Sequence, residues 1–262
     1  MGKAIEKLIP GGDFRWGIGA GLADAESFFA PEDPSGGLLR EKRKWLDAEP
    51  GLYLGLTPEA SGMVSAAWEL ALQWGHVKEP VDGRTLENLA RGWEPDLLLV
   101  SGEDMALVAG AVCFPSSWDL RRAIGKPLQE VHEVVPRLNA QVGGKVARFM
   151  TALQDGKSYG RINWSLTRTA ERNYHPALGR KKLDAGVTLE ELHLRIEHQM
   201  FCAAGDGVLM GLRIEPVPLV DLASHMETWE GLREKIRTMP RDVAEYKGMD
   251  TARAAILEVM GG

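Results

Sequence analysis

One stretch of the chain, Leu107 to Pro136, limits the fold more than any other because it joins a buried strand to several fixed backbone points. It opens with eight apolar or small residues, 107–114, which have the length and residue types of a buried strand. Pro115 ends that strand, since proline cannot donate a hydrogen bond to a sheet ladder. A single imidazole, His132, follows within an apolar stripe. The stretch therefore predicts a strand that leads directly to an isolated histidine.

The pattern around this stretch predicts an α+β fold, an antiparallel sheet with flanking helices. Two tightly joined strands, Asp96–Val100 and Met105–Phe114, indicate a hairpin, and Glu190–Met200 with Gly207–Ile214 indicate a second one. Strand hairpins with helices outside them are typical of this fold class. Further extended pieces are expected at 51–56 and 161–166. Helices are expected at 38–47, 57–74, 85–91, 142–153, 219–226, 229–239 and after Met249. No linker or repeat interrupts the chain, so we expect one domain over residues 1–262.

Composition and charge indicate which partners and cofactors the protein is not expected to bind. The net charge of −6 argues against nucleic acid, which needs a basic footprint. No apolar run is long enough to span a bilayer, so we expect no membrane association. Two cysteines, Cys113 and Cys202, make no disulfide framework and favour a reducing, cytoplasmic setting. They are also too few to hold an iron–sulfur cluster, and no P-loop or HExxH spacing is present.

Three residues are candidates to ligate a metal. His132 lies among apolar residues that favour the neutral, ligating imidazole, although such a histidine also commonly serves as a structural residue bonded to a carbonyl. His198 is the second candidate: if it shares a strand face with Leu194 and Ile196, it points into whatever the sheet covers. Cys113 would require a buried thiolate, and a cysteine in a strand is usually only a small apolar residue.

Cations and tryptophans supply the other candidates for a cofactor pocket. Arg161 and Arg195 match carboxylates well through their planar forks, but an ion pair with Glu197 is an equal alternative. Lys126 is a further candidate partner of a carboxylate, or it faces solvent. Two tryptophans, Trp118 and Trp164, are candidate pocket walls, although core packing is the simpler interpretation.

The same segments carry a resemblance to the heme-dependent oxidative N-demethylase family. The run CFPSSW followed by GKPL and VHEVVP resembles that family's CFPS-x-W, GK-x-L and IH-x-PVP elements, with Val134 in place of the first proline of PVP. The run RINW, from Arg161 to Trp164, matches the family's R-x-NW motif. The run RIEHQ, from Arg195 to Gln199, resembles its R-x-ERQ strand. His198 stands where the family has arginine, and the R-L-P element that follows is absent.

The resemblance implies a PAS-like fold, heme b held through a histidine, and removal of a methyl group from a small amine with dioxygen and release of formaldehyde. It also implies electrons from a separate flavin and iron–sulfur reductase. On this basis His132 is the expected iron ligand, because the family has arginine at the position of His198. Both His198 and Glu197 are expected catalytic residues. A heme- or ligand-binding sensor or carrier without turnover stays open as the alternative.

Overall fold

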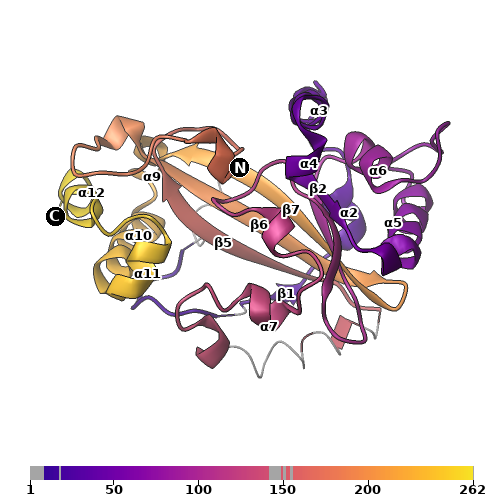
Figure 1. Cartoon of the computed structure of the whole chain (residues 1–262). Helices are drawn as coiled ribbons and strands as arrows, with labels where there is room; N and C mark the ends of the chain where they lie inside the picture. Colours follow the sequence, from indigo (N-terminus) through magenta and orange to yellow (C-terminus); the bar gives the residue numbers. More distant parts are fainter. Residues whose placement is uncertain (1–8, 18, 142–148, 150–151, 154–155, 262) are drawn as a thin grey trace.

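The computed structural model describes residues 9–17, 19–141, 149, 152–153 and 156–261. Its centre is a seven-stranded antiparallel sheet in the order β1-β5-β6-β7-β3-β4-β2 (Figure 1). The strands are β1 (Gly21–Leu22), β2 (Leu54–Leu56), β3 (Asp96–Val100), β4 (Leu107–Ala111), β5 (Tyr159–Thr167), β6 (His193–Ala204) and β7 (Gly207–Pro218). The α+β class expected from the sequence is therefore observed.

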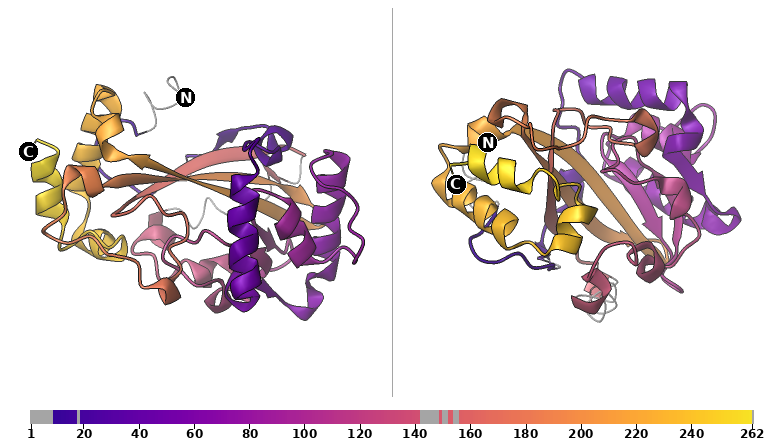
Figure 2. Two further views of the ribbon diagram at one scale, coloured as in Figure 1. Left: turned by 90° about the horizontal axis from the view of Figure 1, so that it is seen from above. Right: turned by 60° about the vertical axis from the view of Figure 1, so that its left-hand side comes forward.

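Helices gather at the two ends of this sheet, the N-terminal set at one end and the C-terminal set at the other (Figures 1 and 2). The α-helices are α2 (Ala25–Phe29), α3 (Gly37–Ala48), α4 (Pro50–Tyr53), α5 (Ser61–Gln73), α6 (Leu86–Gly92), α7 (Leu128–Val131), α9 (Leu219–Leu222), α10 (Met226–Thr238), α11 (Arg241–Tyr246) and α12 (Arg253–Val259). Short 3₁₀ turns are η1 (Pro58–Ala60), η2 (Leu120–Arg122), η3 (Pro176–Leu178) and η4 (Leu189–Glu191). Within the described ranges, no helix is long and apolar enough to cross a membrane.

Both predicted hairpins are confirmed. Strand β3 pairs with β4, and β6 pairs with β7 over twelve residues, from His193↔Pro218 to Ala204↔Gly207. The turns of the two hairpins touch: a Cβ added to Gly102 would lie 1.8 Å from the Asp206 carbonyl oxygen. Only glycine permits this approach, so the position fixes how the hairpins sit against each other.

Three apolar clusters hold the helices to the sheet. The first packs α2, α3, α5 and α6 on the sheet around Phe29 and Trp93, whose ring centroids lie 4.4 Å apart. The second packs the C-terminal helices around Leu194 and Ile196 of β6. The third joins β3, β4 and β7 to the segment that runs through η2 and α7. Strand β6 contributes residues to both the first and the second cluster, so it links the two ends of the sheet.

Several predicted boundaries are wrong for local reasons. The extended piece expected at 51–56 begins instead with the helical turn α4, because Pro50 occupies its first position, and only β2 is a strand. The strand expected at 105–114 is limited to β4, since Met105 has φ +55° and the chain turns after Ala111. The helix expected at 219–226 is split into α9 and the start of α10. Most of the helix expected at 142–153 lies outside the described residues.

Candidate functional site

The candidate site is built around the carboxylate of Glu197, in the middle of β6. The Ser116 hydroxyl donates to Glu197 Oε2 at 3.1 Å, and the Gln199 amide donates to Glu197 Oε1. Strand β5 places Asn163 directly opposite Glu197, so the two side chains lie on the same face of the sheet. Because each carboxylate oxygen has its own donor, the orientation of Glu197 is fixed by residues from two different segments.

Arg195 holds the chain that follows β4 against this site. The residue is 1% exposed, and its guanidinium donates to the Phe114 carbonyl at 2.8 Å and the Pro115 carbonyl at 3.3 Å. Its Nε donates to Ser116 Oγ at 3.0 Å, so Ser116 bridges Arg195 to Glu197. Burial lowers the pKa of Arg195 to about 10, and the negative charge of Glu197 opposes that shift. These contacts give Arg195 a structural part, and its part in cofactor binding stays a prediction.

Arg161 is a second cation of this site, and it has an N–H donor that no described residue accepts. It lies opposite Gln199 in the β5–β6 register and shares the face of Glu197. Its Nε is buried and has no hydrogen-bond partner among the described residues. Burial lowers the pKa of Arg161, while attraction to Glu197 raises it. A buried guanidinium with an unpaired N–H is an expected receptor for an external acceptor such as a carboxylate.

His132 lies at the C-terminal end of α7, near this guanidinium. Burial lowers the pKa of His132 and the positive charge of Arg161 lowers it further, so both favour the neutral ring. Neutral imidazole is the form that ligates iron. The segment after His132 is fixed, because Trp16 Nε1 donates to the Pro136 carbonyl at 2.8 Å and Arg137 pairs with Asp242 at 2.8 Å.

The apolar surroundings of His132 differ in part from the prediction. Val134 is 72% exposed, so it does not enclose the ring; it follows the end of α7 and points outward. Val131 instead packs against the third cluster, as do four aromatic residues, Trp118, Phe149, Tyr159 and Phe201. The ring of Phe149 makes edge contacts with Tyr159 at 5.4 Å and Phe201 at 5.2 Å. This group supplies an apolar aromatic wall on the side of the third cluster.

The other predicted cofactor contacts, Lys126, Trp118 and Trp164, lie in different parts of the structure. Lys126 is half-exposed and pairs with Glu130 at 3.0 Å, which satisfies it at the surface. Trp118 is half-buried against the third cluster, and Trp164 is half-buried against the second. The structure thus places Trp118 with the apolar wall and Trp164 on β5, within the strand that carries Arg161. Their contact with a cofactor stays a prediction.

His198 lies on the other face of β6 from Glu197. As predicted, it shares its face with Leu194 and Ile196, but its ring is about one-third exposed. Its Nε2 lies 3.0 Å from Glu215 Oε2, and this contact lowers the pKa of Glu215. The structure therefore does not bring His198 and Glu197 together. Their joint catalytic role stays a prediction, and the geometry favours Glu197.

Another histidine, His175, is fully buried and has a structural explanation. His175 is 2% exposed, and its Nδ1 accepts from the Ala177 N–H at 3.2 Å at the start of η3. Its ring makes an edge contact with Tyr53 at 5.7 Å. Its Nε2 lies 3.7 Å from Asp119, beyond hydrogen-bond distance. Since one nitrogen already accepts from the backbone, His175 belongs to the packing of the 173–179 loop.

The sequence did not single out three residues that complete the site. Ser116 lies in the polar corner after Pro115, and nothing in its local pattern showed that it would reach Glu197. Lys247 Nζ donates to the Trp164 carbonyl at 2.6 Å and lies over the rings of Trp16 and Trp164. No local pattern pointed to Lys247 or Trp16.

The residues on this face fit a heme. His132 lies within electrostatic range of one guanidinium with an unpaired N–H, and its neighbours Leu128 and Val131 pack against the cluster that carries the aromatic wall. Three cations, Arg161, Arg195 and Lys247, act on one carboxylate, Glu197, which leaves a positive surplus that suits propionates. Heme iron needs only one or two protein donors, so a lone histidine suffices. Among the described residues, no cluster of three His, Cys, Asp or Glu side chains offers a site for a bare metal ion.

Comparison with known families identifies the chain. Residues 55–257 match the family described as haem-dependent oxidative N-demethylase, alpha subunit-like. The match includes every predicted site residue from Trp118 to His198, and it extends over most of the chain. The family description names heme dependence, oxidative N-demethylation and an alpha subunit. The chain therefore belongs to the haem-dependent oxidative N-demethylase, alpha subunit-like family.

Proposed function

We propose that this protein is the heme-bearing subunit of an oxidoreductase that removes a methyl group from a small amine. In this proposal it binds heme b without a covalent link and uses dioxygen. A separate flavin and iron–sulfur reductase supplies electrons, and the methyl carbon leaves as formaldehyde. The observation that supports it best is the convergence of His132, Arg161 and Glu197 in a chain of this family.

Each residue has a defined part in the proposed site. His132 would hold the iron, because its surroundings favour the neutral ring and its segment is fixed by the contacts at Pro136 and Arg137. Arg161 would receive a propionate at its unpaired Nε. When bound, the heme supplies the site for dioxygen activation. The protein itself provides orientation, charge and exclusion of water.

Glu197 would act on the substrate amine. Ser116 and Gln199 fix its two oxygens, so its carboxylate has one orientation on the face that carries Arg161. A carboxylate so held can accept a hydrogen bond from a protonated amine and place the methyl group. The proposed activity therefore depends on Glu197 for orientation and on His132 for the cofactor.

Three further elements belong to the same proposal. We assign the antiparallel sheet with its flanking helices to a PAS-like fold, in one domain over residues 1–262. We place the protein in the cytoplasm, and both cysteines, Cys113 and Cys202, are free and buried, as a reducing setting favours. We expect neither nucleic acid nor a membrane among its partners.

The ligand assignment is tested by adding hemin to purified wild type, His132→Ala and His198→Ala proteins. We expect wild type and His198→Ala to retain heme with the same Soret spectrum, and His132→Ala to lose heme or its strong-field spectrum. Circular dichroism should show that all three proteins are folded. A spectrum that survives His132→Ala and collapses in His198→Ala would move the ligand to the other face of β6.

Turnover separates the enzyme from a sensor or carrier. Wild type and Glu197→Gln proteins would be loaded with heme and supplied with a chemical reductant, dioxygen and dimethylamine. We expect formaldehyde from wild type and a loss of at least tenfold in Glu197→Gln, because the neutral amide holds an ammonium poorly. Heme binding without formaldehyde from a panel of methylated amines would instead favour a sensor or carrier.

A further inference from the structure

Lys247 places a cation between two tryptophan faces at the edge of the candidate site. Its Nζ lies 5.3 Å from the centre of the Trp16 ring and 5.0 Å from that of the Trp164 ring. It also donates to the Trp164 carbonyl at 2.6 Å. Cation–π contacts of this kind are attractive, and they strengthen as the ammonium is desolvated. One ammonium thus makes three specific contacts, and none of them is to solvent.

These contacts join three segments that are far apart in the sequence. Trp16 comes from the N-terminal segment, Trp164 from β5, and Lys247 from the end of α11. The indole of Trp16 also donates to the Pro136 carbonyl, four residues after His132. A change at Lys247 is therefore expected to reach the histidine segment through Trp16 and the sheet through Trp164.

Lys247 also acts on the site through its charge. Burial lowers the pKa of Lys247 to about 8, the attraction of Glu197 opposes this shift, and Arg161 adds to it. The ammonium is therefore within electrostatic range of two charged residues of the site, Glu197 and Arg161. Its effect on Glu197 is favourable, whereas its effect on Arg161 is repulsive and strengthens the positive field there.

We propose that Lys247 is a positioning residue of the candidate site: its ammonium fixes Trp16 and Trp164 at the edge of β5, the strand that carries Arg161. The inference rests on the proposed function only for what the site binds, because the contacts themselves are between residues of this chain. In the proposed site Lys247 contacts neither the substrate nor the heme. It acts by holding the edge of β5 and the N-terminal segment in place and by adding positive charge.

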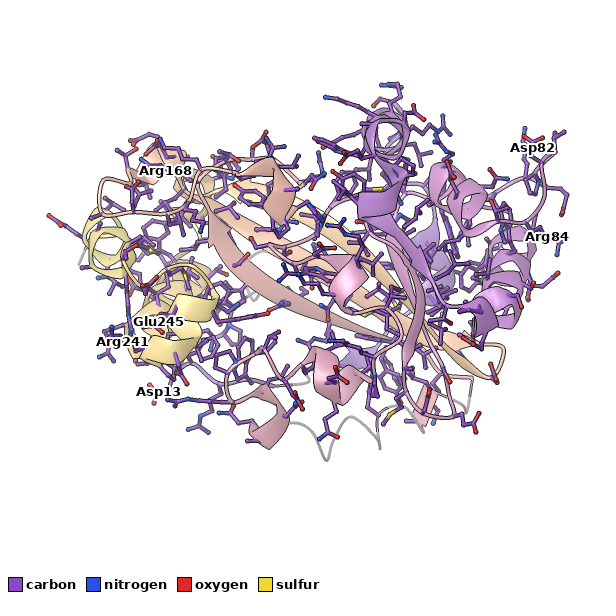
Figure 3. The ribbon with its side chains drawn as sticks, in the orientation of Figure 1. Asp13, Asp82, Arg84, Arg168, Arg241 and Glu245 are labelled. Atoms are coloured by element: carbon purple, nitrogen blue, oxygen red, sulfur yellow. The ribbon has the colours of Figure 1, made fainter. Side chains whose placement is uncertain are left out.

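The first test follows tryptophan fluorescence against pH in the protein without heme. In wild type we expect an emission change with a midpoint near pH 8, as the charge beside Trp16 and Trp164 is lost. Trp164→Phe should reduce this change, and Lys247→Met should abolish it. Arg241→Met is the matched control, because Arg241 is on the same helix (Figure 3) and is 89% exposed with Glu245 as its partner. A midpoint near pH 8 that persists in Lys247→Met would overturn the inference.

The second test measures hemin affinity of the same variants at pH 7. We expect Lys247→Met to bind hemin about tenfold more weakly than wild type, because the edge of β5 and the N-terminal segment are then held less firmly and one positive charge is lost. Lys247→Arg should recover most of this affinity, since it keeps the charge, but it should show no transition near pH 8. Equal affinity of Lys247→Met and wild type would refute the positioning role. If wild type itself binds no hemin, the proposed function fails, while the fluorescence titration still decides the role of Lys247.

Discussion

Replacement of Arg195 by methionine tests whether this buried cation holds the chain after β4. In wild type its guanidinium donates to the carbonyls of Phe114, Pro115 and Glu171 and to the Ser116 hydroxyl. Methionine fills a similar volume but donates nothing. The Phe114 and Pro115 carbonyls lie at buried positions, and each unsatisfied buried acceptor costs about 1–3 kcal/mol.

The expected net loss is smaller than the sum of these contacts because the variant no longer buries a charge. Removal of one partner from a buried charged network typically costs about 3–5 kcal/mol. We expect Arg195→Met to lose about 3 kcal/mol of unfolding free energy. For a chain of this size that corresponds to a fall in Tm of roughly 6–12 °C.

Urea and thermal unfolding followed by circular dichroism would measure this loss. Lys126→Met is the matched control, because Lys126 is half-exposed in a surface pair with Glu130, where pairs contribute about 0.3–0.5 kcal/mol. A loss below about 1 kcal/mol in Arg195→Met would refute the structural role. Arg195 would then be free to serve as a cofactor contact, as the sequence alone also allowed.

Two further predictions concern stability. Lys42 is fully buried, pairs with Asp96 at 3.3 Å and donates to the three carbonyls of residues 93–95. Lys42→Met should therefore lower the free energy of unfolding, measured in urea, by about 3–5 kcal/mol. A loss below about 1 kcal/mol would contradict this. The His198 contact lowers the folded-state pKa of Glu215, so its stabilisation is present above the usual pKa of 4.5 and is lost as pH falls through the lower, folded value. Glu215→Gln should therefore weaken the dependence of Tm on pH below about 4.5, and an unchanged acid profile would show that the contact is too screened to matter.

The sequence by itself determined the local elements and which residues share a face. Alternation along β6 separates Leu194 and Ile196 from Glu197 because successive side chains of a strand point to opposite sides. Turn residues between apolar runs fixed both hairpins for a similarly local reason. His132 stood out because no other imidazole follows a strand in an apolar stripe of this kind.

Tertiary structure alone decided how the side chains pair. Ser116 reaches Glu197 across 81 positions, and Lys247 reaches Trp164 across 83. Such contacts depend on how the hairpins and terminal helices pack, and no local pattern encodes them. The same packing gives Arg195 and His198 their partners: Arg195 donates to nearby carbonyls, while His198 pairs with Glu215 on the other face. A polar group must satisfy its hydrogen bonds wherever the fold buries it, so its partners are set by the final packing and not by its neighbours in sequence.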